Sequence, residues 1–454
     1  MKYTLFVFAL GLALLSTSCA AGTLQLDFSR APSVGRGNPT LDRLYQKHRI
    51  SKRAVASTVG ELLDNEFYLY FANVSVGTPG QHLRLQIDTG SSDIWFQSAQ
   101  NKICGEASDP CAESGIYNPN DSSTYHELYD DFSIRYGDYS YAKGDYASEY
   151  FTIGGETVTN LTVAIAIDAN ATQGIMGIGY DTNEAVVFNV GPSRRYKNLP
   201  DLLVSQNHIA SRAYSLWLND QEASTGSVLF GGIDRAKYNG TLATLPFISD
   251  DGESTPSEFF VKLDGYGYSD ADGTETSIDS SLKLAVLLDS GTSFIYLPPA
   301  VQSRIANASG ASYNDDLGYY IIPCPEVANS AAFVEFYFDG VTINVPVSQI
   351  FVAATDANNN PINYNNGEQV CLLTVLDNTQ IEVAILGDTF LRSAYVVYDL
   401  DNNQAGLAQS KYNATASDVV AIGTGPDAIS DAVKIKSRTR AHRIDSRAPI
   451  DKSV

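Results

Sequence analysis

The sequence predicts an all-β protein built from two related β-lobes, with a cleft between them and only a few short helices. From Phe67 onward most apolar stretches are short, alternate with polar residues and end in Gly, Pro or Asn turns, as antiparallel strands do. An apolar run that ends in Asp, a hydroxyl residue and Gly occurs twice, at 85–96 and 286–297. The length of 454 residues exceeds what one ordinary core accommodates. These observations indicate a duplicated β-lobe.

The first lobe is expected over residues 54–240. The sequence predicts two strands joined by a Gly-Thr-Pro-Gly turn from "FYLYFANVSVGTPGQHLRLQID" and a hairpin from "SIRYGDYSYAKGDYASEYFTIG". A further strand is predicted from "GSVLFGGID". Residues 198–211 instead space their apolar side chains as a helix does.

The second lobe is expected over residues 241–412. Strands are predicted from "FVEFYFDG" and "AYVVYDLDNNQAGLA", and a helix over 297–310, which has Pro near its start and Gly at its end. Asp289 follows Asp88 by 201 residues, and each aspartate is followed later by Ile, an apolar residue and Gly, at 175–177 and 385–387. So long a repeat indicates two copies of a lobe, not a solenoid.

The N-terminal residues 1–20 have the pattern of a secretory signal. Lys2 supplies the charged end, "TLFVFALGLALL" the apolar core and "STSCAA" a small-residue cleavage region. That core is too short to span a membrane stably, and the C-terminus lacks the apolar tail of a GPI anchor. We therefore expect a soluble protein that is secreted to the extracellular space.

Residues 21–53 are expected to be a propeptide. They are net basic and end in Lys52 and Arg53, a dibasic site suited to a kexin-like processing protease. A basic segment of this kind can cover a carboxylate cleft until acid or cleavage releases it; the alternative is a plain basic linker. Residues 413–454 lack apolar periodicity, so we expect a disordered or trimmed tail.

Charge is distributed unevenly along a chain of net charge −22. Residues 1–53 carry 8 Lys and Arg but 2 Asp and Glu, and residues 54–412 carry 15 and 45. Nucleic acid is not expected as a partner, because phosphate binding needs the opposite sign. The acidity is explained either by solubility or by adaptation to acid, and the site chemistry below favours adaptation to acid.

Five cysteines suit an oxidising compartment. Cys19 leaves with the signal, and the spacing of the others favours disulfides Cys104–Cys111 and Cys324–Cys371, although other pairings remain possible. The sequence has no CxxC pair and no HExxH, so no metal is expected. Seven Asn-x-Ser/Thr sequons occur, of which Asn73 lies in a strand-like run and is expected to be too buried for modification. The predicted glycosylation sites are Asn120, Asn160, Asn170, Asn239, Asn307 and Asn413.

The two Asp-hydroxyl-Gly turns carry the predicted chemistry. If they face each other, Asp88 and Asp289 share a small space and cannot both ionise easily, so one pKa falls and the other rises. Such a pair can hold a water between an ionised and a protonated carboxyl group for general acid–base catalysis on an amide. Ser91 and Thr292 can donate to the outer carboxylate oxygens, and Gly in each turn lets backbone amides approach.

The chain resembles the pepsin-like aspartic proteases, and especially fungal secreted or yapsin-like members. The resemblance runs from Phe67 to Tyr412 through "DTGSSDIW", "YGDYS", "GIMGIG", "FGGID", "LLDSGTS" and "ILGDTFLRSAYVVYDLDNNQAGLA". It implies the bilobal pepsin-like fold, acid endopeptidase activity without a cofactor, peptide or protein substrates, a zymogen, inhibition by pepstatin-like peptides and a monomer. It also implies the catalytic pair Asp88 and Asp289, the supporting loop residues Thr89, Gly90, Ser91, Ser290, Gly291 and Thr292, and the substrate-binding flap residues Tyr136, Gly137 and Asp138 with Trp95.

The flap departs from the family pattern at one position. Family members commonly have "YGDGS", whereas this chain has Tyr139 in place of the second Gly, which would narrow the cleft or alter flap movement. Asp138 resembles the acidic position that lets some fungal members accept Lys or Arg before the cut; the alternative is simple solvation. The "SRRY" stretch at 193–196 is either a dibasic nicking site or an exposed loop.

Four other interpretations fit the sequence less well. A catalytically dead pepsin-like binding protein would have lost an Asp or its Gly, and both copies are intact. A two-carboxylate glycosidase would not explain the paired turns, and a serine hydrolase lacks GxSxG. The acidic stretch 399–406 lacks the Gly and Glu of a calcium loop.

Overall fold

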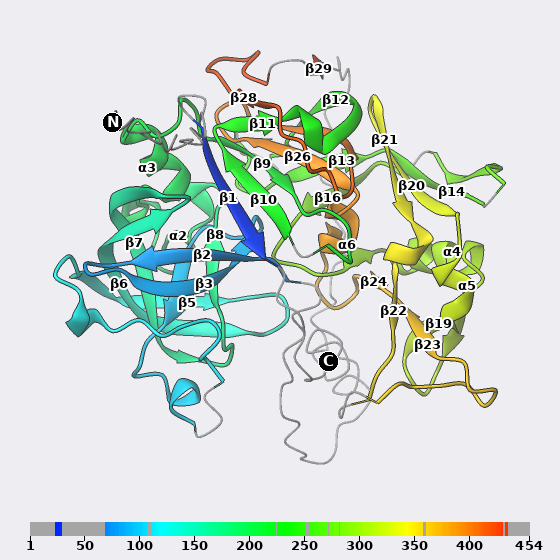
Figure 1. Ribbon diagram of the computed structural model, residues 1–454, viewed down its shortest axis with the longest axis horizontal. Coiled ribbons are helices and arrows are strands. Elements are labelled where there is room, and N and C mark those ends of the chain that lie inside the picture. The colour runs from blue at the N-terminus through cyan, green and yellow to red at the C-terminus, as the bar shows by residue number, and fades with distance from the viewer. Residues whose placement is uncertain are drawn as a thin grey trace, which may run out of the picture.

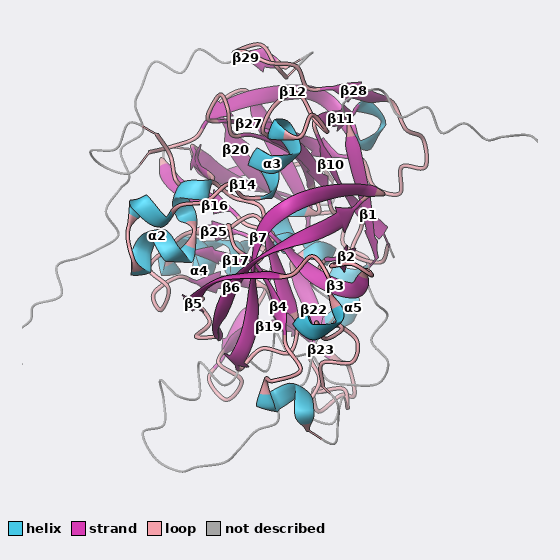
Figure 2. Ribbon diagram, turned by 90° about the vertical axis from the view of Figure 1, so that its left-hand side faces the viewer, coloured by secondary structure: helices cyan, strands magenta, loops and turns pink. Residues whose placement is uncertain are grey.

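The computed structural model confirms the all-β, bilobal architecture (Figure 1). It describes residues 23–29, 69–106, 110–223, 225–249, 255–270, 272–280, 282–356, 360–429 and 432–434. The predicted signal and the Lys52-Arg53 site lie outside these residues. Strands form the body of the molecule, and short helices lie around them (Figure 2).

The strands of the N-terminal lobe pair in one sheet in the order β2-β3-β8-β4-β7-β6-β5. Polar and apolar residues alternate along strand β3. Its last four residues are all buried, and the strand ends at Asp88. It pairs in parallel with β8, so that Asp88 lies opposite Gly177. The strands are β2 (Phe71–Val76), β3 (Gln81–Asp88), β4 (Ile94–Gln97), β5 (His126–Arg135), β6 (Tyr141–Ile153), β7 (Glu156–Ala169) and β8 (Gly174–Gly177).

The C-terminal lobe repeats this arrangement in a sheet of order β13-β16-β25-β17-β24. Strand β16 leads into Asp289 and pairs in parallel with β25, as β3 does with β8. Two four-stranded sheets complete the lobe. The strands are β13 (Phe260–Leu263), β16 (Leu284–Leu288), β17 (Ile295–Leu297), β24 (Val375–Asp377) and β25 (Ile385–Leu386), with β14 (Gly265–Ser269), β15 (Glu275–Asp279), β20 (Phe333–Phe338) and β21 (Val341–Pro346), and β18 (Ser312–Asn314), β19 (Tyr319–Pro323), β22 (Phe351–Ala353) and β23 (Val370–Leu373).

The two halves of the chain share a central sheet beneath the site. Strand β26 of the second half pairs with β9 of the first, and β27 pairs with β12. The predicted lobe boundary at 240 falls inside β12, because this strand crosses from one half to the other. The shared strands are β9 (Ala213–Trp217), β10 (Thr225–Phe230), β12 (Tyr238–Pro246), β26 (Ala394–Asp399) and β27 (Gln404–Ser410).

Helices are short. Two coincide with the predicted helical segments, α3 (Leu199–Ser205) and α4 (Pro299–Ala308). No helix among the described residues is long and apolar enough to cross a membrane. The other helices are α2 (Ala185–Asn189), α5 (Cys324–Ala328) and α6 (Asp388–Leu391), with 3-10 turns η2 (Lys102–Gly105), η3 (Pro119–Asp121), η4 (Asp181–Asn183), η5 (Pro192–Arg194), η6 (Arg235–Lys237) and η7 (Val347–Gln349).

Both ends of the described chain add strands to this framework. Within the predicted propeptide, β1 (Leu24–Ser29) pairs antiparallel with β10, and its last residue pairs with Phe71 of β2. In the predicted tail, β28 (Val419–Ala421) pairs with β11 (Gly232–Asp234), and β29 (Val433–Lys434) pairs with β12.

The expectation of disorder after residue 412 is therefore wrong for the described part of the tail. Ile422, Ala428 and Ile429 are buried against the central sheet. The Asp418 amide donates to Asp234 Oδ1 at 2.7 Å, and Ser417 Oγ donates to Asp234 Oδ2 at 2.9 Å. A few apolar side chains and backbone pairing are enough to hold this segment, so it needs no apolar periodicity.

The cysteines and sequons can now be placed. Cys104–Cys111 and Cys324–Cys371 are disulfide-bonded, as the sequence predicts. All seven sequon asparagines are exposed. Asn73 is among them, so the expectation that it is buried is wrong: it occupies an outward-facing position of β2, whose neighbouring side chains Ala72 and Val74 face the core.

Candidate active site

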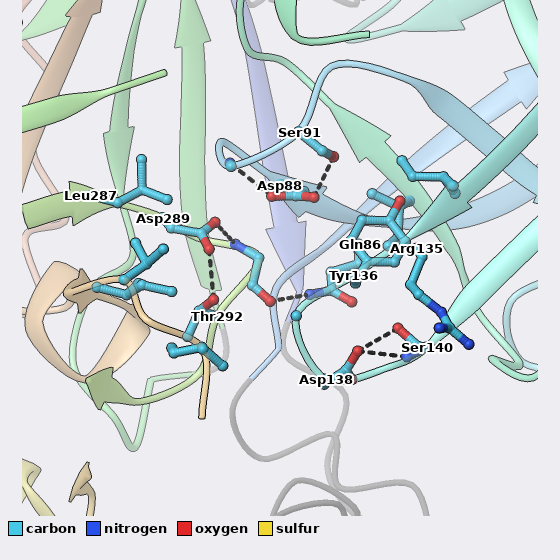
Figure 3. A pocket seen from close by; sticks show the side chains of 18 of the residues that line it. Gln86, Asp88, Ser91, Arg135, Tyr136, Asp138, Ser140, Leu287, Asp289 and Thr292 are labelled. Carbon is cyan, nitrogen blue, oxygen red and sulfur yellow. Dashed lines mark hydrogen bonds between the residues drawn. The ribbon is translucent and has the colours of Figure 1, made fainter. Parts of the chain in front are cut away.

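The two Asp-hydroxyl-Gly turns face each other where the lobes meet (Figure 3). Asp88 and Asp289 are 4% and 7% exposed. A Cβ on Gly90 would lie 2.6 Å from Asp289 Oδ1, and a Cβ on Gly291 would collide with Asp88 Oδ1. Each glycine thus lets the opposite carboxylate approach its backbone, and no other residue fits there.

Each carboxylate receives the same pair of hydrogen bonds from its own loop. The Gly90 amide donates to Asp88 Oδ1 at 2.8 Å, and Ser91 Oγ donates to Asp88 Oδ2. The Gly291 amide donates to Asp289 Oδ1 at 2.8 Å, and Thr292 Oγ1 donates to Asp289 Oδ2 at 2.6 Å. These bonds fix the carboxylate planes and orient an oxygen of each toward the other turn.

The hydroxyl residues between Asp and Gly tie the loops together reciprocally. The Ser290 amide donates to Thr89 Oγ1 at 2.9 Å, and the Thr89 amide donates to Ser290 Oγ at 3.2 Å. Each hydroxyl also donates across the lobe boundary, Thr89 to Leu288 O and Ser290 to Ile87 O, both at 3.0 Å. Because all these groups are buried, the exchange holds the two loops in one relative position.

The electrostatics of the pair agree with a shared proton. Burial, followed by the negative charge of Asp289, raises the pKa of the Asp88 carboxyl to about 8. Hydrogen bonds from Ser91 and the Gly90 amide oppose this rise. Two carboxyl groups at this separation titrate as one unit, and one of them is protonated well above the usual pH for an aspartic acid.

The Ile-apolar-Gly segments brace the two loops. The amide of Ile178, directly after the first segment, donates to Asp88 O at 3.0 Å. The Asp289 amide donates to Leu386 O of the second segment at 3.3 Å. A Cβ on Gly177 would collide with the backbone of Ser92 and Asp93, so the bracing strand must carry Gly there.

A hairpin covers the pair from the side of the N-terminal lobe. Strands β5 and β6 are joined by residues 136–140, in which the Tyr139 amide donates to Tyr136 O at 3.0 Å. Trp95 Nε1 donates to the Tyr136 hydroxyl at 2.7 Å, so the two residues singled out in the sequence do meet. Asp138 Oδ1 accepts from the Ser140 amide at 2.9 Å and from Ser140 Oγ at 2.6 Å.

Tyr139 adopts a conformation that explains why glycine is common at its position. Its φ of 67° lies in the left-handed region, which costs a tyrosine more than a glycine. Its side chain is 54% exposed and is not among the residues that line the cleft. Tyr139 therefore does not narrow the cleft. The other expected effect, on flap movement, stays a prediction.

A cleft of about 440 Å³ runs between the flap and the C-terminal lobe. One wall is apolar around Ile134, Ile175 and Phe188, and the other around Leu287 and Ile381. The carboxylates of Asp138 and Glu258 also line it. The cleft can accept an extended chain with apolar side chains and with cationic groups.

Some residues of the site were not found by sequence reasoning. Gln86 Nε2 donates to Gly291 O at 3.1 Å and joins the lobes, and Asn183 Nδ2 donates to Gly90 O at 3.2 Å. Asp93, the last acidic residue of the first turn, is buried and accepts from the hydroxyls of Tyr146 at 3.0 Å and Tyr196 at 2.7 Å. Of these residues, only Asp93 was indicated by its neighbours in the sequence, because it directly follows the two serines of the first turn.

Within the described ranges, no cluster of three or more His, Cys, Asp or Glu side chains could hold an ion. The groups at the site are two carboxyls with their hydroxyl and amide donors.

Two lobes with a common core, each presenting one Asp-hydroxyl-Gly turn to the other beneath a hairpin, define an aspartic peptidase. Residues 69–410 match the family model of the eukaryotic aspartyl proteases, and the chain belongs to this family. It is 40% identical to the probable aspartic-type endopeptidase opsB of Aspergillus fumigatus, over 85% of this chain and 77% of that protein. It is 38% identical to an acid protease of Saccharomycopsis fibuligera, over 86% and 93%, and 37% identical to the aspartic proteinase yapsin-3 of Saccharomyces cerevisiae, over 90% and 81%.

Proposed function

We propose that this aspartyl protease is a secreted endopeptidase that works at acidic pH and is made as a zymogen, with Asp88 and Asp289 as its catalytic pair. The observation that carries the proposal is the reciprocal approach of each carboxylate to the glycine of the opposite turn. A pair so arranged would hold the attacking water between the carboxyls, with the substrate amide beside it.

In the proposed mechanism the two carboxyls play complementary parts. One carboxyl of the pair holds the shared proton, and the other is ionised. The ionised carboxylate removes a proton from the water, whose oxygen attacks the peptide carbonyl carbon, while the protonated carboxyl donates its proton to the carbonyl oxygen. The tetrahedral intermediate then breaks its C–N bond as the leaving nitrogen takes a proton from the pair. No covalent adduct with the enzyme forms.

The flap and the cleft walls support the proposed substrate class. Tyr136, held by Trp95, lies over the pair and would close on an extended peptide. The apolar walls suit hydrophobic side chains, and Asp138 and Glu258 give the cleft a negative charge that suits Lys or Arg near the cut. A pepstatin-like peptide would occupy the same cleft, and one chain supplies the whole site, as a monomer requires.

Export and activation form the second part of the proposal. The signal-like residues 1–20, the two disulfides and the seven exposed sequons suit the secretory pathway. Cleavage after Lys52-Arg53 by a kexin-like protease would separate the basic propeptide from the acidic body. Because β1 lies in the central sheet, the propeptide is already part of the folded precursor.

The deciding experiment follows cleavage of a denatured protein between pH 3 and 7 by the matured enzyme, with and without pepstatin. Asp88→Asn and Asp289→Asn are expected to lose activity by about 10²–10⁴-fold each. Lys52→Ala with Arg53→Ala should yield unprocessed, inactive precursor. A correctly processed wild type that cleaves nothing across this range would refute the protease proposal and favour a peptide-binding role.

The basic preference has its own test. Peptides with Lys or Leu before the cut are compared for wild type and Asp138→Asn. We expect the ratio of kcat/KM for Lys over Leu to fall about fivefold in the variant, the size of a partly exposed charge interaction. An unchanged ratio would mean that Asp138 only holds the flap turn through Ser140.

A further inference from the structure

Residues 181–198 form a connecting segment between the catalytic loop and the flap. One backbone amide and one side-chain hydroxyl attach it to Asp93 of the loop: the Ala185 amide donates to Asp93 Oδ2 at 2.7 Å, and the Tyr196 hydroxyl donates to Asp93 Oδ1 at 2.7 Å. Asn183 Nδ2 donates to Gly90 O at 3.2 Å. The segment is thus fixed to the turn that carries Asp88.

The same segment contacts the first strand of the flap hairpin. Both Arg194 terminal nitrogens lie 3.1 Å from the Asp131 carboxylate, Nη2 from Oδ1 and Nη1 from Oδ2. The guanidinium carbon also lies 3.5 Å from the centroid of the Tyr129 ring. A bidentate ion pair combined with stacking on an aromatic ring is a geometry that only arginine provides.

These contacts fall where the hairpin is irregular. The β5–β6 register shifts between Glu127 and Tyr129 and again between Tyr129 and Phe132, so Asp131 lies in a bulge. The β6–β7 register shifts at the same level, between Lys143 and Gly144. Bulges bend a strand and interrupt its ladder, so this level is the place where the flap can pivot. Strand β5 is also the last strand of its sheet, and its outer edge is covered here by the connecting segment.

We propose that Arg194 is a positioning residue: through Asp131 and Tyr129 it holds the pivot of the flap at a fixed place relative to the catalytic loop. The inference rests on the proposed function of the flap in substrate binding. Arg194 touches no substrate; it acts through the bulge and so sets how far Tyr136 stands from the catalytic pair before substrate arrives.

The neighbouring Arg195 provides a matched control. Its Nε lies 3.4 Å from Asp181 Oδ2, within the connecting segment itself, and its side chain is 48% exposed, against 23% for Arg194. Removal of either arginine changes the charge of the chain equally, but only Arg194 pairs with the hairpin. A processing protease that cleaved at Arg194-Arg195 would first have to break the contact of Arg194 with the hairpin.

The test uses the matured enzyme in a Trp217→Phe background. The chain has two tryptophans, so Trp95, which is hydrogen-bonded to Tyr136, becomes the single fluorescent reporter of the flap. For Arg194→Ala and for Asp131→Asn we expect KM to rise about threefold to tenfold with kcat changed by less than about twofold, the effect of one partly buried ion pair. Trp95 emission should shift, and the double variant should be no worse than either single variant, because both remove one interaction. Arg195→Ala should leave KM and emission unchanged.

Equal behaviour of Arg194→Ala and Arg195→Ala in KM and in Trp95 emission would overturn the inference. If Arg194→Ala is poorly folded, the nearly isosteric Asp131→Asn variant decides. A shift in Trp95 emission at unchanged Tm supports the positioning role of Arg194, and no shift refutes it. Trp95 emission can be measured without substrate. A wild type that cleaves nothing would therefore refute the proposed function, while the positioning role of Arg194 is still tested.

Discussion

The two lobes present the same turn in different surroundings. Five residues after Asp88 and Asp289, the N-terminal lobe has Asp93 and the C-terminal lobe has Phe294. Asp93 is buried among the hydroxyls of Tyr146 and Tyr196, whereas Phe294 is 1% exposed in an apolar cluster with Tyr319 and Ile321. The turns themselves remain equivalent, so duplication kept the groups at the pair and allowed the support behind each to diverge.

The buried titratable groups behind the two loops also differ in position. In the C-terminal lobe, Asp388 follows the bracing segment, and burial raises the pKa of its carboxyl well above its usual range. Burial raises the pKa of Asp93, and burial raises the pKa of the adjacent Glu184 to about 10. Glu184 Oε1 accepts no hydrogen bond from the part of the chain that the structure describes. The N-terminal lobe thus contains carboxyl groups that favour the protonated form, next to the loop that carries Asp88. Its support is polar and pH-sensitive, and that of the C-terminal lobe at the equivalent position is apolar.

The largest expected effect tests the equivalence of the turns. Gly90→Ala and Gly291→Ala should each reduce kcat/KM by about 10²-fold or more, because the new methyl displaces the opposite carboxylate. Both variants are assayed on one peptide substrate and checked for a wild-type Tm. A variant that retains most of its activity would show that its turn tolerates displacement, and the lobes would not be equivalent at the pair.

The next prediction concerns the pH dependence of stability. A carboxyl whose pKa is raised in the folded state stabilises the fold fully below its unfolded value, near 4.5 for Glu184, and this contribution is lost as pH rises toward about 10. Glu184 alone thus lowers the free energy of unfolding by up to about 1.4 kcal/mol per pH unit in that range. Glu184→Gln should flatten the fall in Tm between pH 5 and pH 8.

The comparison for this prediction lies in the other lobe. Asp388 is 0% exposed, and burial raises the pKa of its carboxyl well above its usual range. Asp388→Asn should therefore also flatten the fall in Tm with rising pH. An unchanged slope for Glu184→Gln beside a flattened slope for Asp388→Asn would mean that the C-terminal lobe alone carries the pH sensitivity.

A smaller effect is expected where the loops exchange hydrogen bonds. Thr89→Val and Ser290→Ala each remove one hydroxyl and leave a buried amide of the opposite loop unpaired, so each should cost about 1–3 kcal/mol. Urea unfolding at pH 5 measures both free energies. A cost several times larger for one variant than for the other would show that one lobe dominates the contact.

The smallest effect separates the aromatic residues at equivalent positions, Trp95 and Tyr296. Trp95→Phe removes the donor to the Tyr136 hydroxyl and should raise KM about threefold to tenfold, the effect of one neutral hydrogen bond. Tyr296→Phe keeps the aromatic ring that lines the cleft and should change KM by about twofold or less. Similar changes in both would mean that Trp95 acts as a cleft wall and not through the flap.

Much of the fold was predictable from the sequence because its evidence was local. Alternating strands, the duplicated turns and the spacing of the four paired cysteines are visible within short windows. The meeting of Trp95 with Tyr136 followed only from the family resemblance. By contrast, the sharing of β12, β26 and β27 by both halves depends on contacts between distant strands, which no window contains.

The errors have the same physical origin. Asn73 was expected to be buried from the apolar character of its run, but its exposure depends on which face of β2 meets the core. The tail around Ile422 was expected to be disordered or trimmed because it lacks apolar periodicity, yet an existing surface of the central sheet needs only a few contacts to bind it. Tyr196 lies 103 residues from Asp93, so nothing local to either residue indicated their hydrogen bond.

The reciprocal hydrogen bonds between Thr89 and Ser290 also bear on the order in which the protein is synthesised. A nascent chain that has emerged through the first lobe has Asp88 but neither the opposing carboxylate nor the hydroxyl that positions its own loop. The central sheet lacks β26 and β27 until residues 394–410 have been made. The complete pair of turns therefore forms only near the end of translation, once the second half of the chain has been made.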